Sequence, residues 1–223
     1  MSRRGEERGR AVNEDRTVDQ ARIVRALSRP EAFPWPSGDV IVHETHGSWV
    51  FVAGDRAAKL KKSVKTPFFD YSTVERRREL CRREVEINRE LAPEIYLGTR
   101  AVVDEGGAVR VASQEDDELE GALDTLVIMR RIHPEQLLDA HVREGRASER
   151  EIDAVVDLLV PFYERARADA SIARHGTPEA VLAPVIGNFA ETEHLVGRHT
   201  SEERFARLKS AQLGFVTLYR DLF

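Results

Sequence analysis

The feature that most constrains the fold is a change of hydrophobic period at Pro134. Before it, most apolar residues fall in short runs rich in β-branched and aromatic side chains, which are typical of strands. After it, apolar residues recur at helical spacing. This order predicts an α+β chain with an antiparallel sheet first and helices after it. The segment "RRIHPEQ", residues 130–136, is the predicted boundary between the two lobes.

The first lobe reads as a short helix, three strands, one embedded helix and further strands, giving five or six strands in all. Turn signals separate the predicted strands at Gly54-Asp55-Arg56 and at Glu105-Gly106-Gly107. Ser72 and Glu75 form a capping-box pattern that starts the embedded helix, and Pro93 ends it. The predicted strands lie near 39–45, 48–53, 56–62, on both sides of 105–107, and over 124–132; helices are predicted near 18–27, 72–92, 134–143, 148–170, 179–197 and 201–223.

Composition sets the domain limits and excludes several classes of partner. Residues 1–16 mix both charge signs with almost no apolar side chains and are predicted to be a disordered tail, followed by a sheet lobe over 17–132 and a helical lobe over 133–223. The net charge of −5 provides no positive field for nucleic acid or an anionic membrane. The N-terminus has no apolar signal-peptide core, and the single cysteine, Cys81, fits a reducing compartment. We therefore expect a cytoplasmic protein.

Two neighbouring segments carry candidate chemistry. On the embedded helix, Glu84 falls on the same stripe as Leu80 and Ile87, where a carboxylate is costly unless a cation meets it. On the strand before the helix, Ala57, Lys59 and Lys61 share one face. A small residue followed by a lysine two positions on leaves room for a flat base and supplies a phosphate contact.

Other interpretations of these residues remain open. Glu84 could reach the helix edge or pair with Arg77 or Arg83, and the lysines could be solvated charges on an edge strand. The last strand, with Val127 and Met129, could be a core strand and nothing more.

Three segments together resemble a known family: "ETHGSWVFVAGDRAAKLKKSV", "FDYSTVERRRELCRREVEINRELAPEIYLGT" and "VIMRRI". They are similar to the aminoglycoside-phosphotransferase-like kinase domain of bacterial proteins that often carry a C-terminal P-loop ATPase domain, over about residues 18–223. The resemblance implies a protein-kinase-like fold that binds ATP, with Mg²⁺ in the intact family. It implies that Lys59 contacts phosphate, that Glu84 holds Lys59, and that the nucleotide base lies against Ala57 and a hinge at Val127 and Met129.

The sequence also departs from that family. It contains no His-Gly-Asp loop, no following metal-binding Asp and no P-loop, and only Gly47 stands where a glycine-rich loop would be. Arg220-Asp221-Leu222 resembles part of a kinase catalytic loop, but the helical spacing of Leu208, Phe215 and Tyr219 assigns it to the end of a helix. We therefore expect a kinase-like domain truncated before its catalytic loop, with a partial helical lobe, no catalytic residue and no metal ligand.

Three functions follow as alternatives. The first is the truncated domain, whose family reaction would be ATP-dependent phosphoryl transfer to a small-molecule hydroxyl. The second is a non-catalytic module that binds a nucleotide or a protein partner, with that partner covering apolar surface left on the last helices. The third is a structural domain in which Lys59 and Glu84 never meet.

Overall fold

The computed structural model describes residues 20–66, 69–113 and 121–220. Contacts group the chain into two compact units that meet between Val155 and Val156, inside one helix, and each unit is described by itself. The predicted lobe boundary at "RRIHPEQ" therefore stays a prediction. The predicted tail, residues 1–16, and Asp221 lie outside the described residues.

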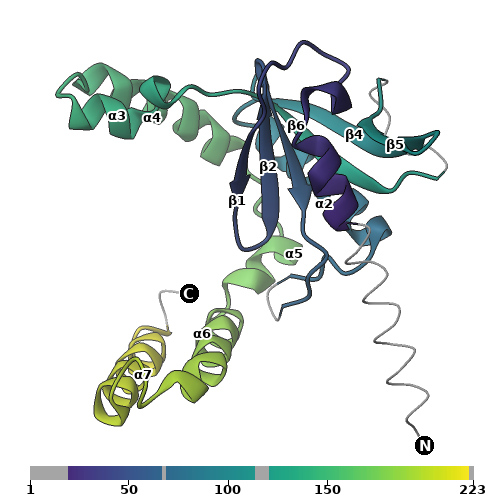
Figure 1. The fold of residues 1–223 in the computed structure, drawn as a ribbon. Helices are drawn as coiled ribbons and strands as arrows, with labels where there is room; N and C mark the ends of the chain where they lie inside the picture. The colour runs from purple at the N-terminus through teal and green to yellow at the C-terminus, as the bar shows by residue number, and fades with distance from the viewer. Residues whose placement is uncertain (1–19, 67–68, 114–120, 221–223) are drawn as a thin grey trace, which may run out of the picture. The chain divides into compact units, whose positions relative to one another are not determined.

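A six-stranded sheet forms the centre of the first unit (Figure 1). Its strands are β1 (Ile41–Glu44), β2 (Ser48–Ala53), β3 (Arg56–Lys61), β4 (Tyr96–Glu105), β5 (Ala108–Val111) and β6 (Asp124–Arg130). They lie in the order β1-β2-β3-β6-β4-β5, and each pair of neighbours is antiparallel. The predicted α+β class with an antiparallel sheet and an embedded helix is confirmed.

The two faces of the sheet bury different partners. Ala58 and Leu60 of β3 point to a large apolar core that also contains Ile23 and Leu27, from the helical residues 20–27. The alternate residues point to the opposite face, where Val127 of β6 packs in a smaller cluster under α2 (Val74–Arg89). Strand alternation thus separates the lysines of β3 from the main core.

Helix α2 differs in two details from its prediction. Its N-cap is Thr73 and not Ser72: the Thr73 hydroxyl accepts from the Arg76 N–H. The stripe that faces the sheet is Arg77, Cys81 and Val85, whereas Ile87 is 54% exposed. The prediction was wrong for Ile87 and did not identify Arg77, which occupies the buried stripe in an ion pair with Asp124.

The named elements of the described chain after β6 are helices, as predicted. The α-helices are α3 (Leu138–Arg143), α4 (Glu149–Arg165), α5 (Ala170–Ala173), α6 (Pro178–Thr192) and α7 (Glu202–Leu218), and the 3₁₀ turns are η2 (Pro134–Gln136), η3 (Arg174–Gly176) and η4 (Glu193–Leu195). Another 3₁₀ turn, η1 (Pro30–Ala32), precedes the sheet. Large apolar side chains are exposed on the later helices, among them Val156, Tyr163 and Leu218. None of the described helices is long and apolar enough to cross a membrane.

We expect Gly54→Ala to destabilise the sheet lobe by about 2–3 kcal/mol. Gly54 forms the β2–β3 turn with φ of +64°, and a Cβ there would collide with the carbonyl oxygen of Pro36. Urea unfolding measures the effect. Gly106→Ala is the matched control, because Gly106 has nearly the same φ, +63°, with open space around it. Equal losses of unfolding free energy in the two variants would show that the collision with Pro36 does not contribute to the effect.

Candidate functional site

The α2-facing side of the sheet brings together four residues singled out from the sequence. In the β3–β6 ladder, Ala57 is opposite Met129, and Lys59 is opposite Val127. Residues two apart on a strand point to the same face, so the four form a block on two adjacent strands. Glu84 reaches this block from α2.

Glu84 binds two lysines, one with each carboxylate oxygen. The Nζ atom of Lys59 lies 2.8 Å from Oε1, and the Nζ atom of Lys61 lies 2.5 Å from Oε2. The Lys61 side chain is only 5% exposed, whereas that of Lys59 is 30% exposed. Glu84 therefore joins a buried cation to one that solvent, or a ligand, can still reach. The two alternatives in which Glu84 pairs with Arg77 or Arg83, or never meets Lys59, do not describe this structure.

Lys59, Glu84 and Lys61 form a triad. Their contacts with one another determine the protonation of Glu84 and Lys61. Burial alone would raise the pKa of Glu84, but the hydrogen bonds and charges of Lys59 and Lys61 outweigh it and lower that pKa. Burial likewise works to lower the pKa of Lys61, and its bond to Glu84 outweighs burial and raises it. Glu84 is therefore a carboxylate and Lys61 an ammonium at neutral pH. The triad carries a net positive charge, which favours an anion beside Lys59.

Aromatic side chains lie beside the triad at Lys61. The Lys61 ammonium lies 5.0 Å from the centroid of the Tyr71 ring, which stacks on Phe69 at 4.5 Å. Gly47, in the turn between β1 and β2, lies against these rings, and its carbonyl accepts from the Lys62 N–H at 2.8 Å. The turn of "HETHGSW" is thus anchored near Lys61, at the end of β3.

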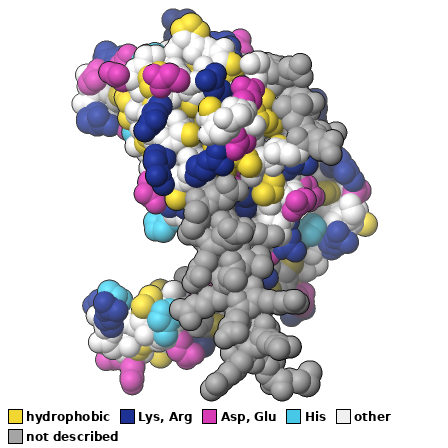
Figure 2. Space-filling view, turned by 45° about the vertical axis from the view of Figure 1, so that its right-hand side comes forward, with side chains coloured by type: hydrophobic (Ala, Val, Ile, Leu, Met, Phe, Trp, Pro, Cys, Tyr) yellow, Lys and Arg dark blue, Asp and Glu magenta, His cyan; other side chains and the backbone are white. Residues whose placement is uncertain are grey.

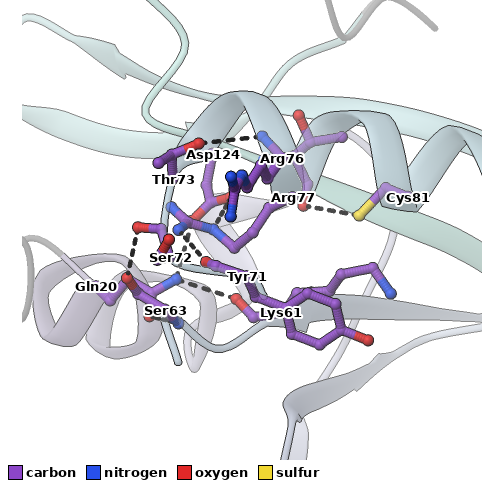
Figure 3. Close-up of polar contacts among 11 residues, drawn as sticks. Gln20, Lys61, Ser63, Tyr71, Ser72, Thr73, Arg76, Arg77, Cys81 and Asp124 are labelled. Atoms are coloured by element: carbon purple, nitrogen blue, oxygen red, sulfur yellow. Dashed lines mark hydrogen bonds and ion pairs between the residues drawn. The ribbon is translucent and has the colours of Figure 1, made fainter. Parts of the chain in front are cut away.

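A buried polar network reaches the backbone of Lys61 (Figure 3). Asp124, at the start of β6, is 0% exposed and accepts two hydrogen bonds from Arg77 Nε and one from Nη2, at 2.8–3.0 Å. Gln20 donates to both Asp124 Oδ2 and the Lys61 carbonyl at 3.0 Å, and its own oxygen accepts from the Ser63 N–H at 2.7 Å. The network ties α2 and the helical residues 20–27 to the end of β3.

The sequence-based prediction gives Lys61 no role in the site and does not identify the buried network. The face that Lys61 shares with Lys59 is the signal that could have included it. In that prediction Arg77 is a possible Glu84 partner, whereas Cys81 and Val85 follow it at four-residue spacing and mark the buried stripe. Nothing in the local sequence identifies Asp124 as its partner, 47 positions away.

The structure restricts what Val127 and Met129 can do. Val127 is fully buried against Cys81 and Val85, and its backbone lies between β3 and β4, with Lys59 and Thr99 opposite it. Val127 therefore cannot contact a ligand as the hinge prediction required, because both its side chain and its ladder positions are already occupied. Met129 is also paired on both sides, with Ala57 and Tyr96, so only its half-buried side chain remains a candidate contact.

Comparison with known proteins gives relatives without an assigned role. The chain is 34% identical over 182 residues to uncharacterized protein Rv2004c of Mycobacterium tuberculosis strain ATCC 25618 / H37Rv, and equally to uncharacterized protein Mb2027c of Mycobacterium bovis. The match covers 82% of this chain but 34% of each relative, so the chain spans about a third of the length of these curated relatives. No family model matches the sequence, and no solved structure matches it.

Proposed function

We propose that the sheet lobe binds the phosphates of a nucleotide such as ATP at Lys59, as the first lobe of an aminoglycoside-phosphotransferase-like kinase domain. Glu84 holds Lys59, and Ala57 and Met129 provide an apolar surface for the base. Kinases place the phosphate-binding lysine on a strand and its glutamate on the helix that follows. In the intact family the reaction would be phosphoryl transfer to a hydroxyl.

One observation carries this proposal: the ion pair of 2.8 Å between Lys59 Nζ and Glu84 Oε1. It joins the third strand to the helix directly after it, in a sheet whose last long strand, β6, returns beside β3. Ala57 stands two residues before the lysine on the same face. Strand position, helix position and spacing together agree with the kinase arrangement.

Binding is proposed separately from catalysis. A lysine and a glutamate position phosphates, but they supply neither the base nor the metal ligands of phosphoryl transfer. The sequence contains no His-Gly-Asp loop that would supply them. This favours the second candidate for the chain as given, a module that binds nucleotide without transferring a phosphoryl group. Both candidates require the same contact between Lys59 and phosphate.

Calorimetric titration with ATP and ADP, with and without Mg²⁺, tests the proposal. We expect the wild type to bind, and Lys59→Ala to bind at least about tenfold more weakly, because one charge-assisted contact is lost. Lys62→Ala is the matched control: Lys62 lies three residues on and pairs with Glu44 at 2.5 Å instead of Glu84. The absence of binding by the wild type would overturn both candidates, and so would equal affinities of the wild type and Lys59→Ala.

A further inference from the structure

An arginine-rich cavity lies on the other side of the sheet from Lys59. Its volume is about 620 Å³, and it is formed by the helical residues 20–27 with the turn after them, and by β5. The floor is apolar, with Ala26, Ala32 and Val109. Val109 and the first helix belong to the main core, whereas Glu84 approaches the opposite face. The cavity is therefore separate from the candidate nucleotide site.

The charges around this cavity are not balanced. Four arginines line it, Arg22, Arg25, Arg29 and Arg110, against one carboxylate, Glu31. Arg22 is already used: it binds Asp104 at 2.6 Å and the Gly107 carbonyl at 3.0 Å. Within the described part of the chain, no carboxylate forms an ion pair with Arg25, Arg29 or Arg110. Three of the arginines that line the cavity thus have no carboxylate partner among the described residues.

The arginines that line the cavity are concentrated on one short segment of the chain. Arg22 and Arg25 are three residues apart within the helical residues 20–27, so these like charges are neighbours on one face, and Arg29 follows in extended backbone beyond the end of the helix. In the groove along α2, by contrast, the charges of the lining residues are balanced. It is lined by equal numbers of basic and acidic residues: Glu75, Arg78, Glu79, Arg82, Arg83 and Glu86. Figure 2 shows the same mixing of basic and acidic side chains across the face that it presents.

The cavity is also preorganised. Asp104 accepts from Arg22 and, through its other oxygen, from the Gly107 N–H at 2.7 Å. This holds the helix against the β4–β5 turn, so the two walls that carry arginines are fixed relative to each other. Arginines line both walls, and a guanidinium group binds phosphate oxygens in pairs.

We propose that this cavity binds a small anion with two linked phosphate groups, of the diphosphate class. Arg25 contacts it from the helix, Arg29 from the turn after the helix, and Arg110 from β5. One phosphate leaves part of the positive charge unmatched, whereas a diphosphate carries more negative charge and more oxygens for the arginines to bind. The proposal does not depend on nucleotide binding at Lys59.

Titration with inorganic pyrophosphate tests this site. We expect the wild type to bind and the double variant R25Q/R29Q to bind at least about tenfold more weakly. Arg110→Gln, on the other wall, should weaken binding as well. R83Q/R207Q is the matched control: it removes the same charge from two exposed arginines on α2 and α7, and should bind like the wild type. Lys59→Ala should also bind like the wild type.

Several results would overturn the proposal. They are no binding by the wild type, unchanged binding by R25Q/R29Q or Arg110→Gln, and loss of binding in Lys59→Ala alone. Thermal unfolding without ligand separates binding from folding. R25Q/R29Q should unfold at the same or a higher temperature than the wild type, because two like charges that line one cavity are removed. A lower unfolding temperature would contradict the repulsion on which the proposal rests.

Discussion

Asp124→Ala should lower the free energy of unfolding by about 3–5 kcal/mol, the largest effect that we expect of any single change to the sheet lobe. Asp124 is 0% exposed and Arg77 only 4%, so removing the carboxylate leaves a buried guanidinium without its counter-charge. The Gln20 amide loses an acceptor at 3.0 Å as well. Urea unfolding followed by circular dichroism measures the loss.

The control is Asp139→Ala. Asp139 forms an exposed pair with Arg143 on α3, four residues away, and such pairs contribute little to stability. We therefore expect this variant to unfold nearly as the wild type does. A loss below about 1 kcal/mol in Asp124→Ala would contradict the buried network, since that is the range of surface pairs.

Glu84→Gln should lower the free energy of unfolding by about 2 kcal/mol at pH 7. Two charge-assisted hydrogen bonds are weakened, and two ammonium groups no longer have an anion between them. The loss should depend on pH. The contacts of Lys59 and Lys61 lower the pKa of Glu84 in the folded protein, so its stabilisation is fully present above its ordinary value of 4.5 and is lost as pH falls through the lowered pKa. The difference between wild type and variant should shrink on acidification.

Urea unfolding of both proteins at a series of pH values from 7 down to about 3 measures this difference. Glu86→Gln is the control, because Glu86 is exposed on the same helix and contributes no bond to the triad. A stability difference that stayed constant down to the most acidic pH would show that Glu84 does not titrate with a lowered pKa.

The order of elements could be predicted because each pattern is local. The β2–β3 hairpin follows from Gly54 between two alternating runs, and α7 follows from the spacing of Leu208, Gln212 and Phe215. The exact face of α2 could not be predicted. An arginine inside the buried stripe is favourable only because Asp124 meets it, and that partner comes from a distant strand.

The candidate site was predictable to the extent that it rests on strand alternation. Strand periodicity predicts that Ala57 and Lys59 share a face, and helix periodicity predicts that Glu84 points inward. The structure contains the ion pair between Lys59 and Glu84. The role given to Val127 was wrong, because sequence does not show that β6 is paired on both sides and covered by α2. The sequence does not show that Glu84 binds two lysines, one with each carboxylate oxygen, because this depends on how α2 lies against β3.

Affinity labelling with a lysine-reactive ATP analogue, mapped by mass spectrometry, tests the central claim most directly. The chain's lysines are Lys59, Lys61, Lys62, Lys65 and Lys209, so the position of the label is informative. We expect Lys59 to be labelled, since it is the more accessible partner of Glu84, and excess ATP to protect it. Labelling of Lys62, Lys65 or Lys209 to the same extent as Lys59, without protection by ATP, would contradict a nucleotide site at Lys59.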